Sequence, residues 1–192
     1  MDPRQRFTEL YQRHYDAVMR YAIRRTDPDT ARDVVAETFL VAWRRLDAVP
    51  GRAGEAEPWL YAVARRTLAN ADRSRRRADR VTARLAHQRP DAAQPDPADA
   101  ITERARVEQA LRGLPEADQE ALRLVGWEEL SVAGAALAMG CSRTAMSVRL
   151  HRARRRLARS LEPGGPAGSA AGNRPSDSGP DDRVVMRTEE AL

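Results

Sequence analysis

The chain has 192 residues, enough for one medium-sized domain or two small ones. Its 33 basic residues, all arginine, outnumber 28 acidic ones, and aromatic residues make up 5% of it, which leaves few rings for a large β-sandwich. The apolar runs are too short for a membrane span, the N-terminus lacks a secretory signal, and the single cysteine, Cys141, excludes an internal disulfide framework. We therefore expect a soluble, cytoplasmic protein without membrane insertion.

Two helices are predicted in the first fifty residues. Apolar residues recur at helical spacing over residues 4–25, which predicts an amphipathic helix. Asp27 followed by Pro28 is a helix start, and the second helix is predicted to run to about Leu46. Its apolar face comprises Val34, Val35, Thr38, Phe39, Ala42 and Leu46. Trp43 and Trp59 also fall at helical spacing with their neighbours and are interpreted as core residues.

A third helix is predicted after the breakers Pro50, Gly51 and Gly54. It begins near Pro58 and runs into an arginine-rich segment at residues 73–77. The following segment AHQRPDAAQPDPADA, residues 86–100, has three prolines and no large apolar side chain, which is typical of a linker between domains. A second set of helices follows, and residues 163–180 are rich in Gly, Pro, Ser and Ala, which favours disorder.

Positive charge is concentrated in two segments of the chain. Residues 61–80 hold seven arginines and two acids, and residues 131–161 hold seven arginines and no acid. Residues 81–130, between them, are net negative. Two separate basic segments indicate contact with nucleic acid. A solvated helix face is the alternative for either segment, and it explains the second less well because thirty-one residues carry no acid.

The second basic segment has the layout of a helix-turn-helix. Ser131 is placed to cap its first helix, Gly140 to end that helix in the left-handed conformation, and Ser142 to cap the second helix. In the second helix the buried face is predicted to be Met146, Leu150, Ala153 and Leu157. The opposite face then presents Arg143, Thr144, Ser147, Val148 and Arg152, with Arg149 and Arg156 beside it. Such a helix fits the DNA major groove.

No arrangement of residues indicates catalysis. The three histidines, His14, His87 and His151, lie in different segments without grouped carboxylates, so neither a metal site nor a cofactor is expected. The sequence has no glycine-rich phosphate loop and no nucleophile elbow. Cys141 occupies a turn position that usually points into the core, which favours a small buried side chain over a redox sensor.

The order of motifs resembles the extracytoplasmic-function (ECF) group of bacterial RNA polymerase sigma factors. FTELY (residues 7–11) with His14 and Val18 is similar to the first helix of the family's region two, and DVVAETFLVAW (33–43) to its polymerase-binding helix. WLY (59–61) followed by ARRTLAN (64–70) is similar to the segment that meets the minus-ten promoter element. Leu114-Pro115, Trp127-Glu128, Leu130-Ser131 and RLHRAR (149–154) resemble region four, which contacts the minus-thirty-five element.

The chain departs from the family pattern at several positions. Ala36 stands where Gln often precedes the Glu-Thr-Phe triplet, and Arg66 where an Asn often follows Ala-Arg. Gly134 and Ala135 stand where the first helix of the helix-turn-helix commonly carries Glu and a large aliphatic residue. A glycine inside a helix costs about 1 kcal/mol of helix stability relative to alanine, so region four is expected to be less stable on its own.

The resemblance implies an all-α fold of two small helical domains joined by a flexible linker, with the helix-turn-helix in the second. We expect region two at residues 1–82, the linker at 83–103, region four at 104–161 and a disordered tail at 162–192. The implied function is a non-enzymatic sigma factor that binds core RNA polymerase and promoter DNA under the control of an anti-sigma factor. The alternative is a stand-alone helix-turn-helix regulator, and a small helical enzyme is disfavoured.

Both partners have predicted contact residues. The outer face of the second helix is expected to bind polymerase through Asp33, Glu37, Leu40 and Arg44. Promoter DNA is expected to contact the third helix at Asn70, Arg73, Arg76 and Arg77. The DNA contacts predicted in the helix-turn-helix are Ser142, Arg143, Thr144, Ser147, Arg149, Arg152 and Arg155.

Overall fold

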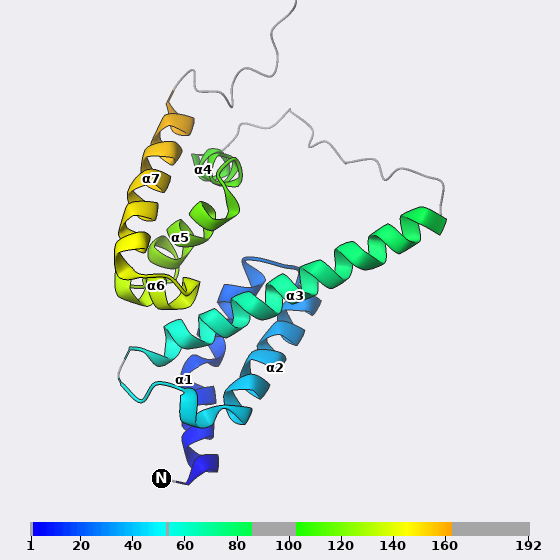
Figure 1. Cartoon of the computed structure of the whole chain (residues 1–192), viewed down its shortest axis with the longest axis vertical. Helices are drawn as coiled ribbons and strands as arrows, with labels where there is room; N and C mark the ends of the chain where they lie inside the picture. The colour runs from blue at the N-terminus through cyan, green and yellow to red at the C-terminus, as the bar shows by residue number, and fades with distance from the viewer. Residues whose placement is uncertain (1, 53, 86–102, 163–192) are drawn as a thin grey trace, which may run out of the picture.

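The computed structural model describes residues 2–52, 54–85 and 103–162, and every regular element within them is a helix (Figure 1). The first set comprises α1 (Pro3–Ile23), α2 (Pro28–Arg44), the short 3-10 helix η1 (Leu46–Ala48) and α3 (Ala56–Leu85). The second comprises α4 (Glu103–Arg112), α5 (Glu116–Gly126), α6 (Val132–Met139) and α7 (Arg143–Leu161). The prediction of an all-α chain with two helical sets is confirmed.

The predicted linker and tail fall largely outside the described residues. At the edges of the linker, α3 continues to Leu85 and α4 already begins at Glu103. The third helix is therefore longer than its arginine-rich segment suggested, because arginine favours helix and no proline follows before Pro90.

The predicted helix caps are present. The Asp27 carboxylate accepts a hydrogen bond from the backbone N–H of Thr30 at 2.9 Å. The hydrogen bonds from Thr30 lower the pKa of Asp27 to about 2. Ser131 and Ser142 accept from the backbone N–H three residues further on, each at 3.1 Å, and Gly140 ends α6 with φ of +66°. These local rules place α6 and α7 as the two helices of a helix-turn-helix.

The first set packs around the apolar face predicted for α2. Val34, Val35, Thr38, Phe39 and Ala42 are all buried. Trp43 corrects the sequence-based interpretation, because 43% of it is exposed. Trp43 lies at the edge of the apolar face and packs edge-on against Phe7, with 5.1 Å between the ring centroids. Only part of its indole ring is therefore buried.

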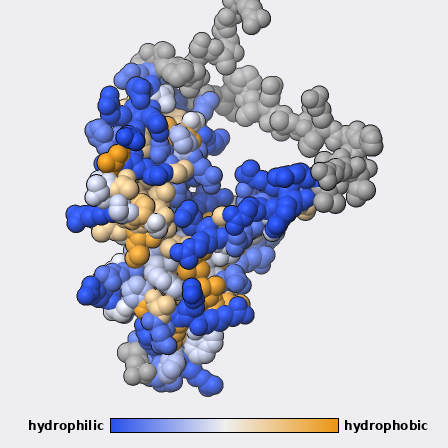
Figure 2. Space-filling model, in the orientation of Figure 1, coloured by the Kyte–Doolittle hydropathy of each residue, from blue (hydrophilic) through white to orange (hydrophobic). Residues whose placement is uncertain are grey.

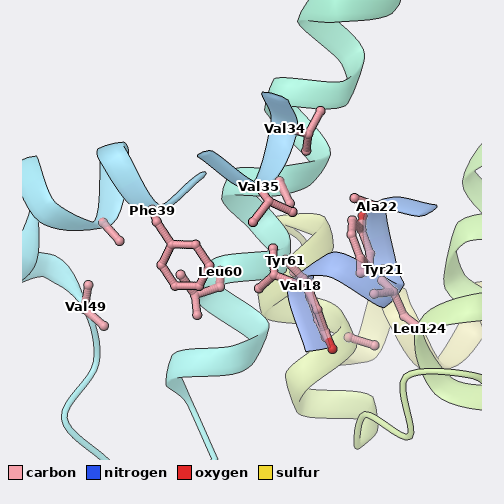
Figure 3. Close-up of a cluster of buried hydrophobic side chains, with 14 of the residues drawn as sticks. Val18, Tyr21, Ala22, Val34, Val35, Phe39, Val49, Leu60, Tyr61 and Leu124 are labelled. Atoms are coloured by element: carbon pink, nitrogen blue, oxygen red, sulfur yellow. The ribbon is translucent and has the colours of Figure 1, made fainter. Parts of the chain in front are cut away.

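The two helical sets touch and share a continuous apolar core. Leu124 of α5 lies beside Tyr21 of α1 and near Tyr61 of α3 (Figure 3), in one cluster with Val18 and Met146. α6 packs along the N-terminal part of α3, while the C-terminal part of α3 projects away from the other helices (Figure 1). That projecting part is hydrophilic (Figure 2). Helical periodicity predicted which faces are apolar but not that one set covers the other.

Candidate nucleic-acid and polymerase interface

A groove of about 1170 Å³ runs between α2 and α3. Asp33, Glu37 and Leu40 form part of its α2 wall, and Asn70 belongs to its α3 wall. Residues predicted separately for polymerase and for DNA are thus neighbours across one groove. Leu40 is 39% exposed, although leucine is an apolar side chain. Arg44 is exposed on α2 but does not line the groove.

The same groove contains residues that were not among the individually predicted contact residues. Trp59, Arg66 and Arg75 line it together with Asn70. The Arg75 guanidinium donates to Asp27 at 3.3 Å and to Thr30 at 3.2 Å, so it joins α3 to the start of α2. The spacing of arginines along α3 could not distinguish Arg75 from its neighbours, because the hydrogen-bond partners of Arg75 lie at the start of α2.

The arginines predicted to contact DNA on α3 are exposed and have polar partners on their own helix. Arg73 donates to the Asn70 side chain, and Arg76 donates to Asp72 at 2.8 Å. Arg77 donates to the Ser74 hydroxyl at 3.2 Å. These contacts join exposed side chains one turn apart, so they cost little to exchange for contacts with phosphate.

Helix α7 has the two faces that the sequence predicts, except that Leu157, which was predicted to be buried, is only partly buried. Met146, Leu150 and Ala153 are buried. The exposed residues of the opposite side include Arg143, Thr144, Ser147, Val148, Arg152 and Arg155. Ser142 caps the helix and is exposed at its N-terminus. The N-terminal turns of α7 are therefore open to a major groove, as direct base contact requires.

Arg149 lies on the side of α7 that faces α5, and it is only partly exposed. Its Nη1 is 4.0 Å from the Asp118 carboxylate, and Arg156 pairs with the same carboxylate. The Asp118 side chain is 9% exposed. One buried acid thus holds two of the α7 arginines. This contact could not be predicted from helical periodicity, because Asp118 lies thirty-one residues before Arg149.

The described residues contain no group of three or more His, Cys, Asp and Glu side chains that could hold a metal ion. His14 lies 3.7 Å from Glu57, and the Tyr61 hydroxyl donates to Glu57 at 2.7 Å. The interaction with His14 lowers the pKa of Glu57, and the bond from Tyr61 lowers it further. Cys141 is partly buried against the core. None of the helices described reaches the length and apolarity of a membrane-crossing segment.

Comparison with known families assigns both helical sets. Residues 10–78 match Sigma-70 region 2, and residues 104–157 match Sigma-70, region 4. The groove between α2 and α3 lies within the first match, and the helix-turn-helix lies within the second.

Individual relatives match over most of the chain. The ECF RNA polymerase sigma factor SigL of Mycobacterium tuberculosis is 31% identical over 154 residues, which is 80% of this chain and 87% of SigL. The ECF RNA polymerase sigma factor BldN of Streptomyces coelicolor is 32% identical over 160 residues, 81% of this chain and 60% of BldN.

Two solved structures share the arrangement of helices. The sigma factor RpoE, crystallised with the anti-sigma factor NepR from Bartonella quintana, gives a TM-score of 0.59 at 25% identity and covers 81% of this chain and 96% of that one. CnrH in complex with the cytosolic domain of CnrY gives 0.53 at 27% identity, over 79% of this chain and 84% of that one.

Proposed function

Because the chain belongs to the ECF group of RNA polymerase sigma factors, we propose that its two helical sets contact separate promoter elements. Factors of this group bind core RNA polymerase and direct transcription initiation at promoters, and this chain is a factor of that kind. The alternative of a stand-alone regulator required a ligand-binding or dimerisation domain in the first eighty residues. Sigma-70 region 2 occupies residues 10–78 instead.

The helix-turn-helix contacts the minus-thirty-five element as duplex. Arg143, Thr144 and Ser147 are exposed on the first two turns of α7, within reach of base edges. An arginine there can donate two hydrogen bonds to one guanine. Arg152 and Arg155, further along the helix, are placed for phosphates, which position the protein without specifying sequence.

The groove between α2 and α3 combines polymerase binding and capture of separated strands. Its α2 wall presents Asp33, Glu37 and the exposed Leu40, a combination of charge and apolar surface that suits a protein partner. Its α3 wall presents Asn70 and Arg66 beside Trp59, and the helix continues into exposed arginines. Basic side chains with aromatic surface bind unstacked single strands. This juxtaposition of two walls is the observation that carries the proposal.

An anti-sigma factor is the regulatory partner that we infer. The sigma factor RpoE, which has a similar arrangement of helices, was crystallised with the anti-sigma factor NepR. The exposed Leu40 and the α2 wall offer a surface that polymerase and an anti-sigma factor would both use. The protein would then act in the cytoplasm, where polymerase and promoter are.

Charge reversal on the α2 wall tests polymerase binding. Asp33→Arg with Glu37→Arg should abolish co-purification with core polymerase while the helical circular dichroism signal stays unchanged, because both side chains are exposed. The matched control is Glu9→Arg with Asp16→Arg, two exposed acids of α1 outside the groove. Co-purification of the groove variant at the level of the control would reject the assignment of the α2 wall.

A gel shift of a promoter duplex tests the function as a whole. The protein should retard the duplex strongly with core polymerase present and weakly without it. Tight retardation without polymerase, unchanged when polymerase is added, would favour the stand-alone regulator.

A further inference from the structure

The outward face of α7 carries one large apolar side chain among polar ones. Among the described residues of this helix, Val148 is the only large hydrophobic side chain that is exposed, at 44%. Its neighbours on that face are all exposed and polar or charged: Thr144, Ser147, His151 and Arg152. A single exposed valine on a protein surface needs no explanation by itself. What Val148 can do therefore depends on where it lies on the helix.

Val148 lies at the centre of the outward face rather than at its edge. An α-helix turns by about 100° per residue, so Val148 is about 190° around α7 from the middle of the face formed by Met146, Leu150 and Ala153. That face is buried, because α7 packs on α4, α5 and α6 along one side (Figure 1). The Val148 side chain thus points directly away from the body of the second helical set.

The stability of α7 does not require a valine at this position. A β-branched side chain loses rotamer freedom in a helix, so valine is a poorer helix former than alanine or arginine. Val148 has no polar atom in its side chain, and its 44% exposure leaves much of its apolar surface in water. Burial of that surface against a partner would be favourable. The side chain is therefore suited to binding rather than to folding.

The short side chains around Val148 allow α7 to approach a groove closely. Val148 lies in the second turn, five residues or about 7.5 Å along the helix from Arg143. The first turns of a helix in the major groove are the part that contacts base edges. Thr144 and Ser147 are as short as valine or shorter, so the helix backbone can come near the base edges. Val148 is then within reach of the bases.

The major groove offers one apolar group that matches this side chain. Thymine presents a C5-methyl group there, whereas adenine, guanine and cytosine present only hydrogen-bonding groups. Apolar side chains recognise thymine through this methyl group. The Val148 side chain ends in two methyl groups and has one strongly preferred rotamer in a helix, so little conformational entropy is lost when it makes such a contact.

We propose that Val148 is a specificity-determining residue and that it recognises the C5-methyl group of a thymine in the minus-thirty-five element. The proposal rests on the proposed function, because it requires that α7 contacts this element as duplex. The preferred element then contains a T·A pair whose contribution to binding comes from the methyl group. Arg143 contributes hydrogen bonds at the first turn, and Val148 contributes an apolar contact one turn further on.

Removal of single methyl groups from the DNA tests the proposal. The preferred minus-thirty-five element is first selected from randomised duplexes with holoenzyme. Each thymine of either strand is then replaced in turn by deoxyuridine, which keeps the base pair and the O4 acceptor and lacks only the methyl group. Affinities are measured for holoenzyme that contains the wild-type chain or Val148→Ala. Ile23→Ala, which shortens an exposed apolar side chain of α1, is the matched control.

At one position, deoxyuridine should weaken binding by the wild-type holoenzyme about three- to fivefold, the effect of one buried methyl group. Val148→Ala should bind the thymine element more weakly by a similar factor and should not distinguish thymine from deoxyuridine at that position. Ile23→Ala should behave as wild type. Each pair of duplexes is the same for all variants, so any effect of the missing methyl group on DNA shape cancels.

Two results would overturn the proposal. The first is that no deoxyuridine weakens binding by the wild-type holoenzyme. The second is that deoxyuridine weakens the wild type and Val148→Ala equally, because another side chain, such as Thr144, would then contact the methyl group. A failure of the proposed function is distinguishable from both, since no base substitution in the element would then change the affinity of the wild-type holoenzyme.

Returning the methyl group on a different base provides a second test. A change from T·A to C·G at the position identified removes the methyl group, and 5-methylcytosine restores it without changing the hydrogen-bonding groups of the C·G pair. The wild-type holoenzyme should bind the methylated form about threefold more tightly than the unmethylated form. Val148→Ala should bind both forms equally. Equal binding of both forms by the wild type would contradict recognition of the methyl group by Val148.

Discussion

The two arginine-rich helices differ in where their acidic and polar partners lie. On α3, Arg73 and Arg76 pair with Asn70 and Asp72, which are exposed side chains of the same helix. On α7 no acid occurs at all, and Asp118 of α5 pairs with Arg149 and Arg156. Similar numbers of arginines therefore give two different surfaces.

This difference determines which arginines are available to DNA. On α3 the partners of Arg73, Arg76 and Arg77 are exposed side chains one turn away on the same helix, so DNA can compete for each of these arginines. On α7 a nearly buried carboxylate holds two arginines towards α5, and among the described residues no ion pair involves Arg143, Arg152 or Arg155. The position of one acid thus separates the arginines paired with α5 from the arginines that we propose to contact DNA.

The largest effect is expected from Arg143, which lies on the first turn of the exposed face. Arg143→Ala should weaken holoenzyme binding to the preferred promoter by about 1–3 kcal/mol and relax preference at one or two base pairs. Affinities for a set of single-base variants of the minus-thirty-five element measure this. Uniform weakening across the set would mean that Arg143 contacts only phosphate.

A smaller effect is expected from Asp118, whose charge anchors two arginines. Asp118→Asn should lower the stability of the protein by about 1 kcal/mol, because hydrogen bonds to charged groups are lost but both arginines are substantially exposed. The released arginines should also make DNA binding more dependent on salt. Thermal unfolding and a salt titration measure the two effects, with the exposed Glu116→Gln as control. An unchanged salt dependence would contradict the proposal that Asp118 keeps Arg149 and Arg156 from contacting DNA.

The smallest effect is expected from Arg155, an exposed residue beyond the reach of base edges. Arg155→Ala should weaken binding to all sequences alike and lower the slope of log affinity against log salt by roughly one unit. Holoenzyme affinity at several salt concentrations measures it. A change in base preference for Arg155→Ala would reverse the docking orientation of α7.

The local features of this fold were predictable from sequence and the contacts between the helical sets were not. Asp27, Ser131, Ser142 and Gly140 follow capping rules that depend on a few neighbouring residues, and all four act as predicted. Glu120, by contrast, belongs to a segment that sequence shows only as net negative. Its partners, Tyr21 and Arg25, lie more than ninety residues away.

The candidate site divides in the same way. The exposed faces of α2 and α7 could be predicted because helical periodicity fixes which side chains share a face. That Asp33 and Asn70 line one groove depends on how α2 packs on α3, which periodicity does not specify. The ion pair between Arg149 and Asp118 likewise depends on a tertiary contact. The sequence therefore predicted Arg149 as a DNA contact without indicating its partner.

The most direct test of the division between the two surfaces is run-off transcription from promoters in which one element at a time is mutated. Arg143→Ala should make transcription insensitive to mutation of the minus-thirty-five element while it remains sensitive to the minus-ten element. Asn70→Ala with Arg73→Ala should show the opposite pattern and should lose permanganate reactivity of the separated strands. If both variants lost sensitivity to the same element, the assignment of α3 and α7 to separate promoter elements would be wrong.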